Sequence, residues 1–316
     1  MKLKNKTKLR PAFTIIEILT IMSIIVLLMG LLVPALNMVK RHAKVVKQRA
    51  QFNAISVALE QFNTEQDGYP ESEAMPLDGS TPMTTGAQRL AEALVGRDLW
   101  GFDPVSSGDH YAERNPQDGS DPYFYNSNDP GVNDSLDRRI GPYLEMDGVD
   151  AYNIIELYQT TGSVYTPPDG NSVSSPVLCD IYRVTRVRKG HNAGARVGSP
   201  ILYYKADLSG RTTDAIYKHA DNQALINLGA FLNNEVTGSK VHMWDSGLNP
   251  GDTAEGTGKN GFYKFIWNPQ FPLDTSSTGY GRYTGSYPYN AKKYILISAG
   301  FDGIFGTEDD VTNFRN

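Results

Sequence analysis

One glutamate lies inside the longest apolar run of the chain, PAFTIIEILTIM at residues 11–22. An isolated carboxylate in lipid costs about 2–3 kcal/mol even on mild insertion scales, so Glu17 needs a cation, a proton or water nearby. If the chain were cut between Ala12 and Phe13, the new amine would lie one helical turn from Glu17, or could meet the Glu17 of a neighbouring copy. The spacing predicts such an ion pair, and the alternative is a hydrated glutamate at the membrane edge.

A second group of carboxylates lies in SAGFDGIFGTEDDVTNF, residues 298–314. Asp302, Glu308, Asp309 and Asp310 fall close together, and three interspersed glycines allow the backbone to fold tightly around a ligand. A hard cation takes about six to eight oxygen ligands from carboxylates and carbonyls, and this loop supplies both. The EF-hand spacing is absent. The pattern predicts a cation site, with a solvated acidic turn as the alternative.

The apolar run from Phe13 to Leu36 is the element that must position Glu17. As a helix it would be about 36 Å long, which is enough to span the hydrocarbon of a bilayer and longer than the apolar part of an ordinary signal peptide. The leader carries five bases and no acid, which predicts a cytoplasmic N-terminus and a head on the far side of the membrane. Lys40, Arg41, Lys44 and Lys47 on that far side weaken the charge bias.

The basic leader, a small residue, Phe-Thr-Ile-Ile-Glu and a hydrophobic helix together resemble the prepilin signature of type IV pilins and type II secretion pseudopilins. The resemblance implies that a prepilin peptidase cuts after Ala12 and methylates Phe13. It also implies that Glu17 neutralises the Phe13 amine of an adjacent subunit, and Pro34 matches the family's interior helix proline. The family usually has glycine before the cut, where this chain has Ala12. The alternative is an ordinary signal anchor.

Past the membrane, the sequence continues as an amphipathic helix without Gly or Pro to residue 66. Its apolar residues follow a spacing of three to four, and its lysines and Gln51 lie off that stripe. The stripe comprises Val39, Ala43, Val46, Ala50, Ile55, Ala58, Leu59 and Phe62. The predicted organisation is a leader at 1–12, a single membrane and stem helix at 13–66, and a globular head at 67–316.

The head is predicted to be α+β, with an antiparallel sheet packed on the stem helix. One helix is expected at Gly86–Val95, capped by Thr84 or Thr85. The expected strands are Val177–Val187, Pro200–Lys205, Gly261–Trp267 and Lys293–Ser298. Segments 101–175 and 206–260 are rich in turn residues and are interpreted as ordered surface insertions.

Composition and motifs exclude several classes of function. Residues 67–316 carry 20 bases and 32 acids, which argues against nucleic acid as a partner. Cys179 is the only cysteine, and the five histidines show no metal or triad spacing, so the chain is not expected to be an enzyme. GTGKNG at 256–261 precedes a strand-like segment, which does not fit a dinucleotide loop. The basic stretch Arg183–His191 fits either a contact with an acidic neighbour or a solvated strand edge.

The C-terminal loop also resembles the calcium loop that follows the last strand of the type II secretion major pseudopilin. Carried over by position, the resemblance implies that Asp302, Asp309 and Asp310 are the side-chain ligands of a structural calcium ion. The carbonyls of Ala299 and Ile304 would complete the shell.

The resulting hypothesis is a structural subunit of a type II secretion pseudopilus in the bacterial inner membrane, with a periplasmic head. The implied partners are prepilin peptidase, further pseudopilin subunits in a homopolymer, an inner-membrane assembly platform and membrane lipid, with no nucleic acid. The alternatives are a surface type IV pilin, a minor pseudopilin, or an envelope binding module anchored by its N-terminus.

Overall fold

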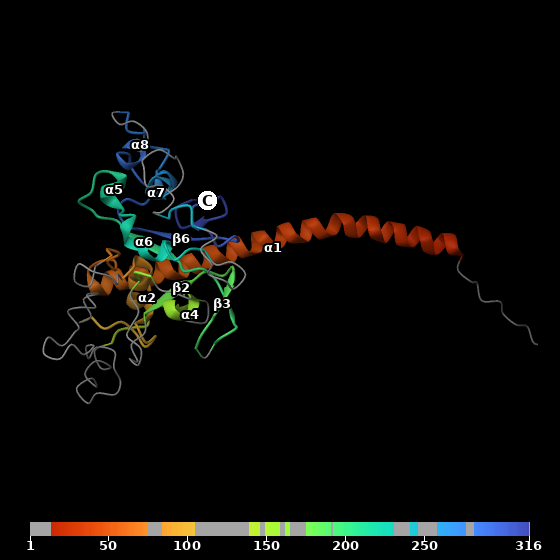
Figure 1. Cartoon of the computed structure of the whole chain (residues 1–316), viewed down its shortest axis with the longest axis horizontal. Helices are drawn as coiled ribbons and strands as arrows, with labels where there is room; N and C mark the ends of the chain where they lie inside the picture. The colour runs from red at the N-terminus through yellow and green to blue at the C-terminus, as the bar shows by residue number, and fades with distance from the viewer. Residues whose placement is uncertain are drawn as a thin grey trace, which may run out of the picture. The chain divides into compact units, whose positions relative to one another are not determined.

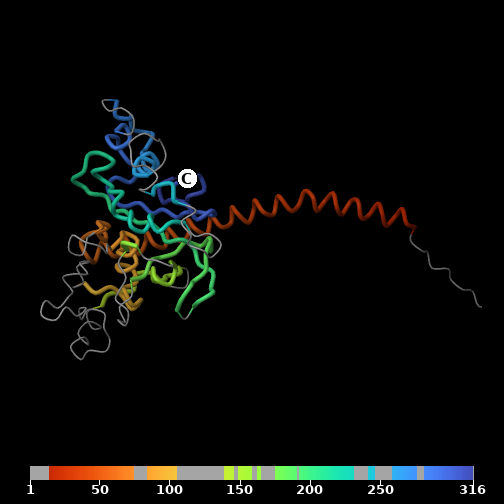
Figure 2. The backbone as a smooth tube through the Cα atoms, in the orientation of Figure 1, coloured from red at the N-terminus to blue at the C-terminus, as the bar shows by residue number. Residues whose placement is uncertain are grey.

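The computed structural model describes residues 14–74, 84–104, 139–145, 149–158, 162–164, 175–190, 192–230, 241–245, 258–275 and 281–315. The chain divides into two compact units, Met1–Val46 and Lys47–Asn316. Helix α1 (Ile15–Gln66) begins in the first unit and ends in the second, and Figures 1 and 2 trace it from red to orange. The predicted fold class is confirmed: a long N-terminal apolar helix is followed by a head of small antiparallel sheets and helices.

In the first unit, the large apolar side chains of α1 from Ile15 to Leu36 are all exposed. This helix is long and apolar enough to cross a membrane by length and composition. Pro34 lies inside the helix, and the helix continues through both Gly30 and Pro34. The chain therefore presents an apolar helical surface near its N-terminus, as a single-pass membrane anchor requires.

In the second unit, the head buries one face of α1. The first two buried residues on this face are glutamines, and the rest are apolar. The buried residues are Gln48, Gln51, Phe52, Ile55, Ala58, Leu59 and Phe62. Placing Gln51 off the stripe was wrong. The predicted stripe was also too long, because Val39, Ala43, Val46 and Ala50 are exposed. The amides are buried because they serve backbone groups of the head: Gln51 Nε2 donates to the Cys179 carbonyl at 2.9 Å, and Gln48 Oε1 accepts from the Ile181 N–H at 3.1 Å.

Three small antiparallel sheets form the β-structure of the described residues. β1 (Asp150–Asn153) pairs with β2 (Pro176–Cys179), and β3 (Thr185–Arg186) pairs with β4 (Arg196–Val197). The third sheet has the order β5-β6-β7, formed by Leu202–Lys205, Tyr294–Ser298 and Val311–Thr312. Every residue of the middle strand β6 is buried, so this strand lies at the centre of the core.

The helices of the head cover these sheets. They are α2 (Gly86–Val95), α4 (Ile154–Leu157), α5 (Thr213–Ile216), α6 (Ala220–Ile226), α7 (Gly258–Ile266) and α8 (Gly281–Thr284). Helix α2 is confirmed with its predicted bounds, and Thr85 forms a capping box with Gln88. Because α2 is buried along its whole length, it is a core helix of the head.

Two predicted strands are wrong or incomplete. Gly261–Trp267 belongs largely to helix α7, since Phe262, Tyr263 and Ile266 bury one helical face and this packing overrides their β-propensity. The predicted strand Val177–Val187 is divided into β2 and β3, because the Asp180 side chain accepts the Tyr182 N–H and turns the chain there. β5 and β6 confirm the other two predicted strands to within two residues.

The two segments interpreted as surface insertions contain regular structure where they are described. Within 101–175 lie β1 and α4, and within 206–260 lie α5, α6 and the start of α7. Much of both segments, including 105–138 and 246–257, lies outside the described residues.

Candidate functional site

The first candidate site is the start of α1, where Thr14 and Glu17 form a reciprocal pair. The backbone N–H and the hydroxyl of Thr14 both donate to Glu17 Oε2 at 2.8 Å, and the Glu17 N–H donates to Thr14 Oγ1 at 3.3 Å. This is a capping box of the S/T-x-x-E type, which is visible in the sequence as Thr-Ile-Ile-Glu. The processing residues Ala12 and Phe13 lie outside the described residues, so the pairing of Glu17 with a Phe13 amine stays a prediction.

The second candidate site is the C-terminal loop, in which Asp309 holds the backbone. Its Oδ2 accepts the N–H groups of Phe301 and Asp302 at 2.6 and 3.1 Å, and its Oδ1 accepts the Thr307 hydroxyl at 2.6 Å. Gly300 and Gly303 have φ values of 65° and 68°, which a side chain would strain. The loop is therefore closed by hydrogen bonds from its own donors to one carboxylate.

The other two predicted ligands lie beside Asp309 but are oriented differently. Asp310 Oδ2 accepts the Gly306 N–H at 2.7 Å, while its buried Oδ1 has no hydrogen-bond partner in the structure. Burial raises the pKa of Asp310 well above its ordinary value, and the nearby charges of Asp309 and Asp302 add to this effect. Burial also raises the pKa of Asp302, whose Oδ1 accepts the Ile304 N–H at 2.8 Å.

These residues fit a calcium ion only in part. The unsatisfied oxygen of Asp310 and the crowding of three carboxylates suit a cation. Asp309, however, already accepts three hydrogen bonds, and across the described part of the chain no three His, Cys, Asp or Glu side chains are grouped so that they could hold a metal ion. Calcium at this loop therefore stays a prediction, and Asp309 has a structural role without it.

Asp309 gives a direct test of these two roles. We expect Asp309→Ala to lower the free energy of unfolding by about 2–3 kcal/mol even in chelator, because two backbone N–H groups lose their acceptor. If an ion also binds, calcium should raise the melting temperature of the native chain and raise that of Asp310→Ala less. Melting curves in calcium and in chelator check both; a native curve that is identical in the two buffers would exclude the ion but leave the role of Asp309 intact.

Two buried histidines hold the segment 241–245, and sequence spacing did not reveal them. His219 Nε2 bonds to the Trp244 carbonyl at 3.0 Å, and His242 Nδ1 accepts the Phe305 N–H at 3.0 Å. The Met243 N–H in turn donates to the Phe305 carbonyl. Burial lowers the pKa of His219 to about 4 and that of His242 to about 3. Both rings are thus neutral near pH 7 and serve as hydrogen-bonding parts of the core.

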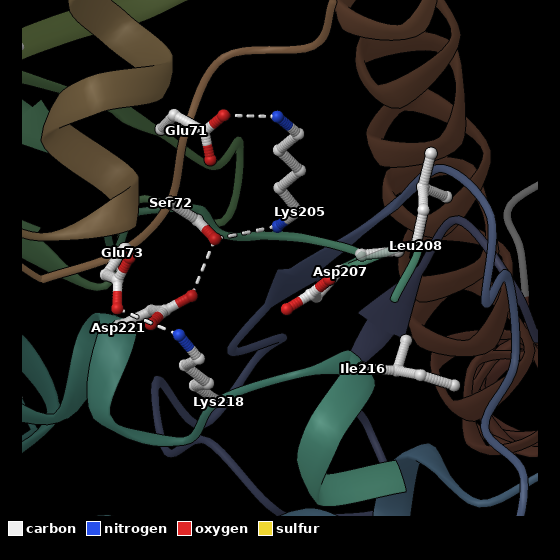
Figure 3. Close-up of a pocket in the computed structure, with 10 residues that line it drawn as sticks. Glu71, Ser72, Glu73, Lys205, Asp207, Leu208, Ile216, Lys218 and Asp221 are labelled. Atoms are coloured by element: carbon white, nitrogen blue, oxygen red, sulfur yellow. Dashed lines mark hydrogen bonds and ion pairs between the residues drawn. The ribbon is translucent and has the colours of Figure 1, made fainter. Parts of the chain in front are cut away.

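A polar hollow of about 380 Å³ lies where the segment after α1 meets β5 and α6, and Figure 3 shows its lining. Glu71 pairs with Lys205, Glu73 Oε1 lies 2.8 Å from Lys218 Nζ, and the Ser72 hydroxyl donates to Asp221 at 2.6 Å. Burial raises the pKa of Asp221 to about 6. Both lysines are already paired with glutamates. We therefore interpret these contacts as structural: they attach residues 71–73 to β5 and α6 of the head.

The glycine cluster at 256–261 does open a helix, contrary to the expectation from sequence, because α7 begins at Gly258. A dinucleotide loop also needs parallel strands beside that helix. Every strand pairing that the structure describes is antiparallel, so the surroundings do not support that site.

Comparisons of the chain with models of protein families, with curated proteins and with solved structures found no match.

Proposed function

We propose that this chain is a structural subunit of a type II secretion pseudopilus. In this proposal the subunit is processed by a prepilin peptidase, anchored in the inner membrane with its head in the periplasm, and assembled as a homopolymer on an inner-membrane platform. Packing of the apolar helices of adjacent copies, with Glu17 paired to a Phe13 amine, supplies the assembly free energy. The subunit catalyses no reaction.

One observation carries this proposal: α1 is one continuous helix with two differently covered parts. From Ile15 to Leu36 its apolar side chains are exposed, with Glu17 in the first turn, whereas from Gln48 to Phe62 one face is buried by the head. A membrane-stored subunit that assembles through its helix needs both parts. A module anchored only for binding needs the apolar part alone, and the two lysines of the polar hollow described above are already paired with glutamates.

The same helix also supports a surface type IV pilin or a minor pseudopilin. The acidic C-terminal loop favours the secretion subunit, because it resembles the calcium loop of that group. In this proposal Asp302 and Asp310 would hold the ion and Asp309 would orient the loop, and bound calcium would stabilise the head by linkage.

Intact-mass analysis of the chain from membranes tests the proposal. We expect loss of residues 1–12 and one added methyl group on Phe13 in cells that contain prepilin peptidase, and an unprocessed chain in cells without it. Phe13→Ala and Ala12→Leu variants, which alter the two sides of the cut, should separate methylation from cleavage. An unprocessed N-terminus in the presence of the peptidase would contradict the subunit and favour the anchored module.

A further inference from the structure

One end of an otherwise acidic head carries seven exposed cations from two parts of the chain. The exposed cations at this end are Lys47 and Arg49 on α1, and Arg183, Arg186, Arg188, Lys189 and Arg196 on and beside the β3–β4 hairpin. Acidic side chains also lie at this end. Glu156 lies beside Gly190, and Asp150 and Asp180 lie near Tyr152 and Tyr182. The C-terminal loop, whose Phe301 contacts Tyr182, adds Asp302, Glu308, Asp309 and Asp310. We call the seven cations the basic end.

Contacts within the head place the hairpin beside the first turns of the helix that the head binds. Gln48, between Lys47 and Arg49, accepts the Ile181 N–H at 3.1 Å, and Ile181 leads into the hairpin. The seven cations thus come from segments far apart in sequence that share one end of the head.

The hairpin is held in place, so its cations form a defined surface. Val187 N–H donates to the Ala195 carbonyl at 2.9 Å, and Arg188 N–H donates to the Glu156 carbonyl at 2.7 Å. Arg186 Nη1 donates to the Gly194 carbonyl at 2.9 Å. The side chains of Arg183, Lys189 and Arg196 are exposed.

Along the sequence, the first cations of this end follow closely after the apolar part of α1. No acidic residue occurs between Glu17 and Glu60, and Lys47 is the eleventh residue after Leu36. As helix, those residues cover about 16 Å, compared with a headgroup layer of about 5–8 Å and a Debye length of about 8–10 Å. Basic residues this close to a bilayer are attracted to anionic lipid.

We propose that the basic end docks on the anionic phosphodiester headgroups of the membrane that α1 enters. Charge attraction to anionic lipid and continuity along the chain with the apolar part of α1 favour lipid over a second copy of the head. The proposal rests on membrane anchoring alone and not on assembly into a filament. It gives Lys47, one of the four cations that weaken the charge bias of the span, a binding role.

The test uses the full-length chain, one copy per nanodisc, with a fluorophore on Ala193→Cys at the exposed hairpin tip. Cys179 is buried and stays unlabelled in the folded protein. The discs contain either phosphatidylcholine alone or phosphatidylcholine with about one third phosphatidylglycerol, each with the same fraction of lipid spin-labelled on its headgroup. We expect quenching at least about twofold greater in the anionic discs at low salt, and loss of the difference near 0.5 M salt.

Replacing Arg183, Arg186, Lys189 and Arg196 by Gln should abolish the difference between the discs. Replacing the three arginines by Lys should retain it, which separates charge from any loss of hairpin structure. The matched control replaces four exposed cations elsewhere on the head, Arg211, Lys259, Arg282 and Lys292, by Gln and should retain it too. Equal quenching in both discs, or a Gln variant that docks like the native chain, would overturn the proposal. Protection of the label only in discs that hold two copies would assign the surface to a second copy instead.

Discussion

Replacing Asp180 with alanine should lower the free energy of unfolding of the head by about 4 kcal/mol, the largest effect we expect from one substitution. Asp180 is 1% exposed. Its Oδ1 accepts the N–H groups of Tyr182 and Ser199 at 3.1 Å each, and its Oδ2 accepts the Ser298 hydroxyl at 2.8 Å. Alanine leaves these three donors buried without that acceptor, and each such loss costs about 1–3 kcal/mol.

These bonds join three parts of the head that are distant in sequence. Tyr182 begins the turn after β2, Ser199 precedes β5, and Ser298 ends β6. Gly198 lies against the same carboxylate: a Cβ there would come within 2.1 Å of Asp180 Oδ1. Asp180 therefore links the β1–β2 sheet to the β5–β6–β7 sheet through side-chain hydrogen bonds.

Chemical unfolding of the full chain in detergent, followed by the fluorescence of buried Trp244, measures this prediction. Asp180→Asn keeps one acceptor oxygen and should cost about half as much. The matched control is Asp207→Ala, for which we expect less than about 1 kcal/mol. Asp207 is exposed, and the hydrogen bonds that its carboxylate accepts among the described residues come from the N–H and hydroxyl of Ser209. A loss for Asp180→Ala no larger than that of the control would contradict its connecting role.

Mild acid should destabilise the head through His219 and His242. Each has an ordinary pKa of 6.5 that burial lowers, to about 4 for His219 and about 3 for His242. Because the unfolded chain takes up these protons more readily than the folded one, the stability is fully present above about pH 6.5 and is lost as the pH falls. Between about pH 7 and 5 the two rings together should cost about 4 kcal/mol.

Asp221 acts in the opposite direction over part of this range. Burial raises its pKa to about 6, so the folded head binds this proton more tightly than the unfolded chain and gains stability as the pH falls below about 6. That gain offsets about 1 kcal/mol at about pH 5. Burial also raises the pKa of Asp302 and of Asp310, so these carboxyls offset a further part of the loss. We therefore expect a net loss that is smaller than the ~4 kcal/mol from the two rings.

Unfolding curves at a series of pH values check the slope. His242→Asn keeps an acceptor for the Phe305 N–H and removes the titrating ring, so it should lower stability at pH 7 yet flatten the dependence on pH. His42→Asn, on an exposed part of α1, is the matched control and should keep the native slope. An unchanged slope in His42→Asn and His242→Asn alike would exclude His242 as a source of the acid sensitivity.

Elements with a local physical cause were predictable from the sequence. Each of these elements is determined by residues that are close together in the sequence. They are the long apolar run of α1, the Thr85 cap of α2, and the apolar runs of β5 and β6. The burial of Gln48 and Gln51 was not predicted, because a side-chain amide on a helix is normally expected to face solvent. Their backbone partners, Ile181 and Cys179, are distant in sequence. Helix α7 was not predicted for a related reason. Its Phe and Tyr residues are equally common in strands, and the helical conformation follows from packing against residues that are distant in sequence.

The candidate sites show the same division. The Thr14–Glu17 pair lies within one turn and could be read from its spacing, and the carboxylates of the C-terminal loop were found by their crowding. Their orientation toward backbone N–H groups could not be predicted, because it depends on the loop conformation. His219 and His242 come together only through Trp244 and Phe305, so no spacing along the chain marks them.

The position of β6 in the chain sets the order in which the head can form. Its partner β5 ends at Lys205, and residues 206–293 must be made before Tyr294 can pair with it. During synthesis, β5 therefore has no central strand beside it until residue 294 is made, and its apolar side chains stay exposed until then. If the head crosses a membrane as proposed above, it completes its core only late in that transfer, and a pause in synthesis before residue 294 would keep it unfolded enough to pass through a narrow pore.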